Sequence, residues 1–400
     1  MVVVSLLAGI VFCTCLLLTL YAYVAYPVCI WMLARCFPTG DRARQVAVEE
    51  LPEVTLIVAA HNEEAVIERK ICNSLALEYP PGRLSVVIAS DGSVDATTEI
   101  AARYVDRGVR LLDYRQRCGK SGLLNVAIAD TGGEILVLSD ANTEYQPDAV
   151  RKLVRWFVDP SVDAVCGRLV LRDSEGGKNV DGVYWRYETF LKGCEGRLGA
   201  LLGANGAIYA IRRRAYVPVP NNTIVDDFVI PLLSKLRRRG RIVFDPAAVA
   251  TEETALHIGS EFRRRARIGT GVYQSLPLLW PLLHPRHGWT AFAFLSHKVL
   301  RWMVPFFLLG MLVSNLLLLE HAIFRAAMAA QAGVYGLALA GAYLPGRGLL
   351  SKLVRVLTMF IGMNLALLVG FSRWLTSPQT GAWQRTARDR KPEAEHSMTR

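Results

Sequence analysis

The sequence predicts an α/β domain with a mostly parallel sheet and helices on both faces, flanked by transmembrane helices. Short apolar runs alternate with polar helical stretches over about residues 49–283, which is typical of a parallel α/β sheet. Longer apolar runs lie on both sides, and 52% of the 400 residues are hydrophobic, which favours membrane contact. We therefore expect a transmembrane anchor at 1–36, the α/β domain at 49–283, a membrane domain at 290–375 and a polar tail at 376–400.

The apolar runs are long enough to span a bilayer. No charged residue occurs from Val2 to Ala34, and roughly 20 apolar residues cross about 30 Å of hydrocarbon. A cleavable signal peptide is the alternative, but this run is too long and no basic region precedes it. The membrane domain is expected to hold about three transmembrane helices, which lie between Arg301 and Glu320, between Arg325 and Arg347, and between Arg355 and Arg373.

Basic residues suggest an orientation in the cell membrane. Arg35, Arg42 and Arg44 follow the first apolar run, so the positive-inside rule places the α/β domain of this multi-pass protein in the cytoplasm. The tail conflicts with the rule if three helices precede it, because it would then lie outside. Its basic residues are Arg385, Arg388, Arg390 and Lys391.

Overall charge and cysteine content exclude little. A formal net charge of +11 attracts nucleic acid, anionic lipid and phosphorylated substrates through the same Coulomb attraction. The eight cysteines form no CxxC pair, so neither a zinc site nor a disulfide framework is indicated. We expect reduced thiols.

Three apolar runs, at 54–60, 84–90 and 134–139, are expected to form buried parallel strands, each followed by a polar loop. Ligands of open α/β sheets bind beyond the carboxyl ends of such strands. The polar residues found there are Glu63, Asp91, Asp140 and Asn142.

Several of these side chains suit phosphate or metal chemistry, and Asp91 and Lys120 each have a structural alternative. Asp140 and Asn142 offer oxygen ligands for a hard cation that bridges a diphosphate. Asp91 precedes a glycine and alone fits an ordinary turn better. Lys120 could meet a phosphate or be a solvated lysine; it belongs to no P-loop, because Tyr114 stands where the first glycine is required.

Two further charged clusters follow. Asp226 and Asp227 precede an amphipathic run, Phe228 to Arg238; they either include a general base or favour the start of a helix through its dipole. The run Glu261 to Arg267 (EFRRRAR) binds lipid headgroups or a leaving diphosphate, or forms a solvated basic face.

Seven motifs in order resemble those of family 2 glycosyltransferases: VAAHNEE, IASDGSVDAT, GKSGLLN, LSDANTEY, GANGAIYAIRR, VDDF and EFRRRARIG. The resemblance spans roughly Pro52 to Gly271, and the flanking membrane segments are similar to the branch with cellulose, hyaluronan and poly-N-acetylglucosamine synthases. It implies a GT-A fold, nucleotide-diphosphate-sugar donors, Mg²⁺ or Mn²⁺, and inversion at the anomeric carbon.

The resemblance also assigns residues. It implies that Glu63 and Asp91 contact the base and ribose of the donor and that Lys120 belongs to the donor site. Asp140 matches the first aspartate of the metal-binding DxD motif, whereas Asn142 replaces the second carboxylate.

Further along, Asp227 matches the proposed base of the TED motif. Arg267 matches the arginine of QxxRW, with Arg264 in place of its glutamine and Ile268 in place of its tryptophan. That tryptophan lies near the acceptor in processive members, so Ile268 argues against processive synthesis.

The expected function is transfer of a sugar from a UDP-glucose or UDP-N-acetylglucosamine type donor to an acceptor hydroxyl, as in exopolysaccharide synthesis. The expected partners are the nucleotide sugar, a carbohydrate or lipid-linked acceptor and membrane lipids, and no nucleic acid. The alternatives are single-sugar transfer to a lipid or other membrane acceptor, an inactive scaffold, and a transporter, although a transporter would show repeat symmetry and ionisable residues within its spans.

Overall fold

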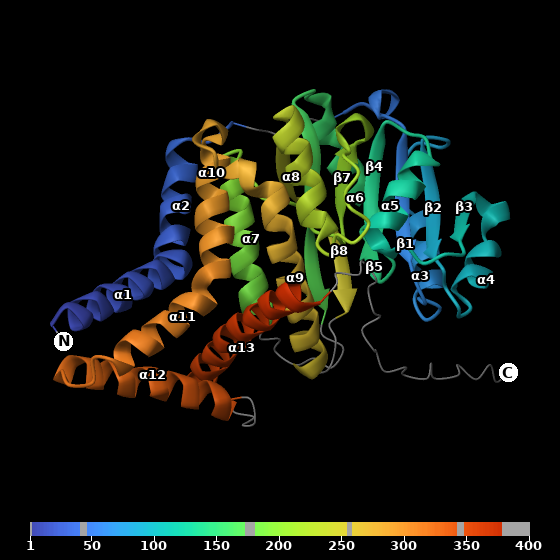
Figure 1. The fold of residues 1–400 in the computed structure, drawn as a ribbon. Coiled ribbons are helices and arrows are strands. Elements are labelled where there is room, and N and C mark those ends of the chain that lie inside the picture. Colours follow the sequence, from blue (N-terminus) through green and yellow to red (C-terminus); the bar gives the residue numbers. More distant parts are fainter. Residues whose placement is uncertain (1, 41–45, 173–180, 254–257, 342–347, 378–400) are drawn as a thin grey trace.

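The computed structural model describes residues 2–40, 46–172, 181–253, 258–341 and 348–377. In Figure 1, one side of the molecule consists of a twisted sheet and the helices that cover it. The other side consists of a group of long helices. Arg42, Arg44 and most of the basic tail lie outside the described residues, so the expectations that rest on them have no structural counterpart.

The described strands form one mixed sheet of eight strands in the order β3-β2-β1-β4-β7-β6-β8-β5. Four neighbouring pairs are parallel and three, all involving β7 or β5, are antiparallel. The α/β class is confirmed, and the sheet is parallel throughout its first half. The strands are β1 (Val54–Ala60), β2 (Leu84–Asp91), β3 (Val109–Tyr114), β4 (Ile135–Asp140), β5 (Thr143–Tyr145), β6 (Val162–Arg172), β7 (Tyr209–Arg212) and β8 (Arg241–Glu253).

The three expected strands are present within one residue at each end, as β1, β2 and β4. In the parallel register Ala59 pairs with Asp140, and Ala60 with Ser90. The carboxyl ends of the three strands therefore meet at one edge of the sheet, as the sequence predicts. The polar loops that follow them meet there too.

Helices cover both faces of the sheet, and side chains alternate between two apolar clusters. Leu56 and Val58 of β1 face the cluster under α3, α4 and α6, whereas Ile57 and Ala59 face the one under α5, α7 and α8. This period of two follows from the strand pleat. The helices of this part are α3 (Ile67–Leu75), α4 (Thr97–Ala102), α5 (Gly119–Ala129), α6 (Ala149–Val154), α7 (Asp181–Arg197), α8 (Asp226–Arg238) and α9 (Ile258–Leu279). Short 3₁₀ turns occupy Val48–Glu50, Val105–Arg107, Arg155–Val158, Arg213–Ala215, Trp280–Leu283 and Pro285–His287.

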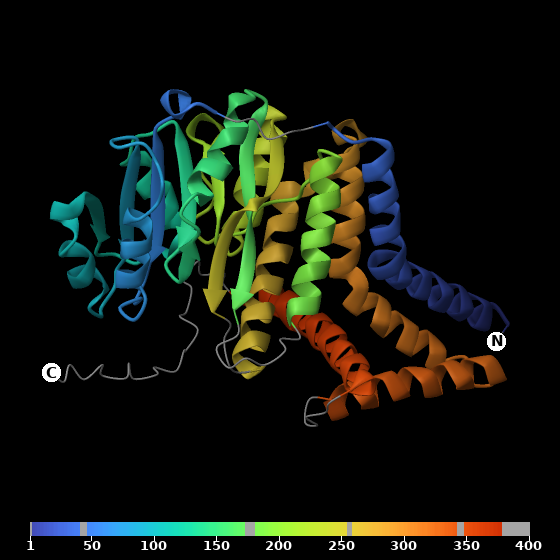
Figure 2. The same cartoon turned by 180° about the vertical axis from the view of Figure 1, so that it is seen from behind.

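Four helical stretches of the described chain are long and apolar enough to cross a membrane: Val2–Cys36, Trp289–Leu316, Ala322–Gly341 and Leu350–Thr376. They coincide with the four apolar runs of the sequence. Figures 1 and 2 show α1, α11, α12 and α13 grouped away from the sheet. Their elements are α1 (Val2–Leu20), α2 (Tyr26–Cys36), α10 (Trp289–Ala293), α11 (Leu300–Leu316), α12 (Ala322–Gly341) and α13 (Leu349–Thr376).

The first apolar run is two helices rather than one straight anchor. A π-helical segment, Tyr21–Ala25, separates α1 from α2, and α1 turns away from α2 at this point (Figure 1). Such bulges are recognised causes of helix kinks. A second π-helical segment, Phe294–Val299, separates α10 from α11, and the hydroxyls of Tyr21 and Ser296 lie 2.9 Å apart across the two bends.

The two halves of this run have different surroundings. Most apolar side chains of α1 are exposed, whereas Tyr26, Ile30 and Ala34 of α2 are buried and α2 packs against α7. The second half of the run is thus held by the α/β domain, and α1 alone leaves it.

Candidate active site

The four long apolar stretches described above are called the membrane-type helices from here on. A cavity of about 530 Å³ opens where the strand ends, α8 and α9 meet these helices. Seven of the eight site residues predicted from the sequence line it: Glu63, Lys120, Asp140, Asn142, Asp227, Arg264 and Arg267. They come from five separate parts of the chain. The fold therefore brings together what the sequence only places in order.

Asp91 is the exception, because it is fully buried behind the cavity wall. Its carboxylate accepts hydrogen bonds from the backbone N–H groups of Cys118 (2.7 Å) and Gly119 (3.0 Å). These groups begin α5, where a negative charge is favoured by the helix dipole. In this arrangement Asp91 orients α5, and the expected contact between its carboxylate and the donor remains a prediction.

The helix that Asp91 orients carries Lys120 into the cavity. The Lys120 ammonium lies 2.8 Å from Oδ1 of Asp140 and 3.4 Å from Oδ2 of Asp226. Burial disfavours its charge, but the attraction of these carboxylates is larger, so the pKa of Lys120 is raised. Lys120 is therefore not a solvated surface lysine.

Asp140 is held in its ionised form by Lys120. Burial raises the pKa of its carboxyl, but the charge and hydrogen bond of Lys120 outweigh burial and lower it. Lys70, which is buried, donates to the carbonyl of Thr143 at 2.9 Å and holds the loop beyond Asp140 from behind. Burial lowers the pKa of Lys70 to about 7, against the attraction of Asp140 and Glu144.

Asp227 lies at the start of α8 and is held by the loop before β7. Its Oδ2 accepts the N–H of Gly206 at 2.9 Å. A Cβ atom at Gly206 would lie 3.4 Å from the Lys120 ammonium and 3.5 Å from the carboxylates of Asp140 and Asp227. These three charged groups therefore converge on the same small glycine.

Asp226 is more than a negative charge that favours the start of a helix. It is buried, and its Oδ2 has no hydrogen-bond partner among the described residues, with the Lys120 ammonium at 3.4 Å. Burial, assisted by Asp227 and Asp140 and opposed by Lys120, raises the pKa of Asp226 to about 6. The sequence could not show that the pKa of Asp226 is raised, because the shift comes from burial in the folded chain.

The two predicted arginines of α9 have different surroundings. Arg264 is bound by Glu261 on the same helix, at 2.8 and 3.0 Å. Arg267 forms no hydrogen bond or ion pair within the described residues, although it lines the cavity. Burial lowers its pKa against the attraction of Asp226, Asp140 and Asp227. Arg267 is thus a cation placed to bind an incoming anion.

The residues for a divalent metal are few. The described residues contain no group of three His, Cys, Asp or Glu side chains that could hold an ion. Asp140 has one oxygen on Lys120, and the amide nitrogen of Asn142 donates to Glu252 at 2.7 Å. Mg²⁺ in phosphate sites commonly keeps waters and uses one or two carboxylates plus the substrate phosphates. Asp140 fits that kind of site when the substrate supplies the remaining oxygens.

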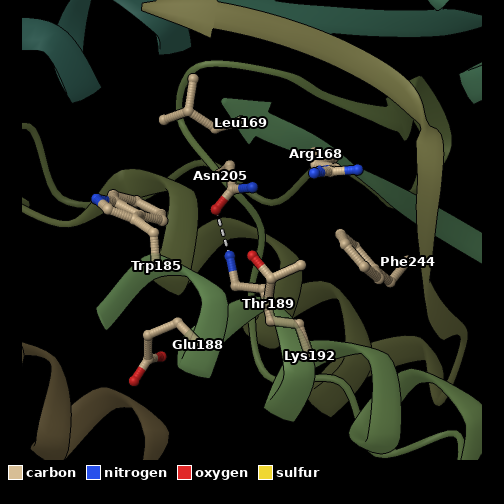
Figure 3. A pocket seen from close by; sticks show the side chains of 8 residues that line it. All are labelled: Arg168, Leu169, Trp185, Glu188, Thr189, Lys192, Asn205 and Phe244. Atoms are coloured by element: carbon tan, nitrogen blue, oxygen red, sulfur yellow. Dashed lines mark hydrogen bonds between the residues drawn. The ribbon is translucent and has the colours of Figure 1, made fainter. Parts of the chain in front are cut away.

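The far end of the cavity holds polar side chains of α7 that motif matching missed, beside Asn205 of the GANGAIYAIRR motif. Figure 3 shows Lys192 of α7 pointing toward Asn205, with Trp185 and Glu188 beside it. The Lys192 ammonium donates to Asn205 Oδ1, and Asn205 donates to the carbonyl of Gly167 at 2.8 Å. Only the fold places α7 here, since nothing in its sequence resembles a motif.

A buried ionic network joins α7 to the membrane-type helices. Glu188 accepts from Arg301 at 2.7 Å. Glu195 accepts from the hydroxyl of Tyr26 at 2.9 Å and contacts His297 Nδ1 at 2.5 Å. Because Tyr26 belongs to α2 and the other two partners to Trp289–Leu316, these bonds fix the α/β domain to both apolar stretches.

The fold has a counterpart among solved structures. The mannosyltransferase PcManGT from Pyrobaculum calidifontis, solved with GDP-Man and Mn²⁺, superposes with a TM-score of 0.67 at 21% identity, covering 92% of this chain and 99% of that one. This likeness includes the membrane-type helices as well as the sheet, and it shows a shared fold.

Residues 55–217 match the model of glycosyl transferase family 2, and this segment is a family 2 glycosyltransferase domain. Two similar proteins are the beta-monoglucosyldiacylglycerol synthase of Synechocystis (29% identical) and the poly-beta-1,6-N-acetyl-D-glucosamine synthase of Staphylococcus aureus (27%). The matches cover 60% and 59% of this chain but only 51% and 58% of those proteins.

Proposed function

We propose that the protein is a membrane-bound, inverting glycosyltransferase that transfers a hexose from a UDP-sugar to an acceptor hydroxyl. The observation that carries this is the convergence of Lys120, Asp140 and Asp227 on Gly206 inside one cavity, within a family 2 domain. The donor diphosphate lies at Lys120 and Arg267, and the sugar points toward Asp227. Glu63, which lines the same cavity, contacts the nucleoside.

Asp227 acts as the general base. A sugar hydroxyl is a weak nucleophile at neutral pH, and a carboxylate that accepts its proton typically accelerates attack about 10² to 10⁴-fold. The hydrogen bond from Gly206 at 2.9 Å occupies one position on Oδ2, which leaves Oδ1 for the hydroxyl. Attack on the face opposite the leaving diphosphate inverts the anomeric carbon, and no covalent enzyme intermediate forms.

The cations of the site stabilise the leaving group. Departure of the nucleoside diphosphate builds negative charge, which Lys120 and Arg267 offset in a site with little water. A divalent ion held by Asp140 and the phosphates would add Lewis-acid stabilisation of the same charge. Asn142, two residues after Asp140, offers a neutral side chain in place of a second carboxylate.

The test of the base is Asp227→Asn, which keeps the shape and removes the basic oxygen. We expect kcat to fall about 10² to 10⁴-fold while the dissociation constant of the donor changes little. Single-turnover transfer by protein in detergent, at saturating donor, measures this; Asp130→Asn, outside the cavity, is the control. Near-normal turnover of Asp227→Asn would place the base elsewhere, and no donor hydrolysis by the wild-type protein would favour a scaffold.

Metal use has a test independent of activity. Mn²⁺ alone should bind weakly and bind more tightly once UDP is present, because Asp140 supplies only part of the coordination. Asp140→Ala should abolish the gain from UDP, and Asn142→Asp should increase affinity if that side chain faces the ion. Electron paramagnetic resonance of Mn²⁺ reads out both. Equal Mn²⁺ affinity with and without UDP would refute the assignment.

The acceptor has two candidates, a growing polysaccharide and a membrane lipid. Single transfer to a lipid is favoured by the apolar side chains that α13 contributes to the cavity, Met363 and Leu367, beside Ile268. Mass analysis of products from a panel of radiolabelled nucleotide sugars distinguishes them: a lipid acceptor yields one solvent-extractable species, whereas a polymerase yields a ladder.

A further inference from the structure

The loop that holds Asp227 is itself fastened from the other side of the cavity. Residues 203–206 form this loop, and two of its N–H groups reach Asp227: Ala204 N donates to the Asp227 carbonyl and Gly206 N to its carboxylate, each at 2.9 Å. The orientation of the carboxylate therefore depends on where the loop lies.

Asn205, at the centre of the loop, is bonded at both ends of its carboxamide. Its Nδ2 donates to the carbonyl of Gly167 on β6 at 2.8 Å, and its Oδ1 accepts from the Lys192 ammonium. Only 9% of Asn205 is exposed, so water cannot readily replace a lost partner. Without Lys192 the carbonyl oxygen of Asn205 would lie unpaired at the edge of the cavity.

Lys192 is committed to the loop rather than to an acidic group. Within the described residues its ammonium has no carboxylate within 4.0 Å, and its bonds go to Asn205 Oδ1 and, at 3.5 Å, to the carbonyl of Ala204. One turn earlier on α7, Glu188 forms an ion pair with Arg301 at 2.7 Å. The same stretch of α7 thus binds a membrane-type helix through Glu188 and the loop through Lys192. Figure 3 shows the second of these contacts.

We propose that Lys192 is a positioning residue that sets the geometry of Asp227 through Asn205 and the 203–206 loop. This rests on the proposed role of Asp227 as base. A base must be held within about 0.5 Å of its working position, and the backbone bonds from Ala204 and Gly206 transmit any shift of the loop to it. Lys192 touches neither the reacting hydroxyl nor the diphosphate in this mechanism.

The experiment compares Lys192→Met with Lys152→Met, a control lysine on α6 that pairs with Asp148 away from the cavity. We expect Lys192→Met to lower the single-turnover rate constant about 10 to 100-fold, with less than about twofold change in donor affinity. The unfolding temperature should fall, because Asn205 Oδ1 loses its partner, but the variant should remain folded at the assay temperature. Lys192→Arg, which keeps a donor to Asn205, should recover most of the rate. Turnover of Lys192→Met equal to that of Lys152→Met would overturn the proposal.

Two further arms keep the result interpretable. In an Asp227→Asn background, Lys192→Met should cause no additional loss, since both changes remove the action of one group; an equal loss in both backgrounds would mean that Lys192 acts independently, and the proposal fails. If Lys192→Met does not fold, Asn205→Ala should reproduce the same selective loss of kcat. An unchanged kcat in Asn205→Ala would also overturn the proposal. An active Asp227→Asn protein would instead disprove the proposed base itself.

Discussion

At the scale of single residues, Lys120 contacts two aspartates whose pKa values are shifted in opposite directions. Asp140 hydrogen-bonds to it at 2.8 Å and its pKa is lowered, whereas Asp226 lies at 3.4 Å and its pKa is raised to about 6. The difference follows from burial and geometry: the shorter contact compensates Asp140 for lost hydration, whereas Asp226 Oδ2 has no hydrogen-bond partner in the part of the chain that the structure describes. Of the two aspartates, Asp226 is the one that loses its charge first as the pH falls.

This predicts that donor affinity depends on pH through Asp226. A carboxyl with a pKa of about 6 is ionised above that pH and neutral below it, so acidification removes a negative charge that opposes the donor diphosphate. Affinity for UDP-glucose, whose diphosphate is esterified at both ends and keeps its charge, should rise about fivefold from about pH 7.5 to about pH 5. Asp226→Asn should bind tightly throughout. Calorimetric titration measures both; a pH dependence retained in Asp226→Asn would exclude this residue as its source.

The same carboxyl bears on stability. Its folded-state pKa is above its ordinary value, so the folded protein binds this proton more tightly than the unfolded chain does. The stabilisation is full below the ordinary carboxyl pKa and is lost as the pH rises through about 6. Asp226→Asn should therefore raise the unfolding temperature at alkaline pH and leave it nearly unchanged in acid.

At the scale of elements, the crossing of α9 and α13 connects a membrane-type helix to the site. A Cβ atom at Gly370 would lie 2.6 Å from the backbone carbon of Gly269 and 2.8 Å from the carbonyl of Ala266. Such close approach needs small residues, the same requirement that applies to closely packed membrane helices. Arg267 and Ile268 lie beside this crossing on α9, so the distance between the two helices sets where they face the cavity.

Gly370→Ala should therefore separate the helices. Helix propensity alone would favour alanine by about 1 kcal/mol, but overpacking against backbone that cannot rotate away costs roughly 1–3 kcal/mol, so we expect net destabilisation and weaker UDP binding through Arg267. Gly362→Ala is the matched control on the same helix, because a Cβ there meets nothing within 4 Å. Thermal unfolding in detergent measures the difference. Equal stability of the two variants would show that α13 can shift without cost.

At the scale of the whole molecule, the buried bonds to Tyr26, His297 and Arg301 make the α/β domain and the apolar helices one unit. The cavity is also formed by both parts, because Arg301 and Trp302 of α11 line it together with Asp227 of the α/β domain. Under the proposed function, these walls place the acceptor at the membrane surface. The proposed function also requires the domain to face the side on which nucleotide sugars are available.

The orientation is testable. We expect protease to digest the domain in inside-out vesicles and to spare it in right-side-out ones, because Arg35, Arg42 and Arg44 favour a cytoplasmic location after the first span. A reporter fused at Pro392 reads the side of the tail, which lies outside if all four candidate spans cross. Protection of the domain in inside-out vesicles would reverse the assignment.

The sequence by itself determined three of the eight described strands, the apolar stretches and seven of the side chains that line the cavity. β1, β2 and β4 were readable because buried parallel strands are continuous β-branched runs, and their carboxyl ends carry Glu63, Asp91 and Asp140 in any parallel sheet. The tertiary structure alone decided which groups face the cavity. It placed Asp91 beneath α5, separated Asp226 from Asp227 by burial, and brought Lys192 to Asn205, 13 residues away in the chain. Local patterns encode period and polarity, whereas burial and pairing between distant segments exist only once the elements pack.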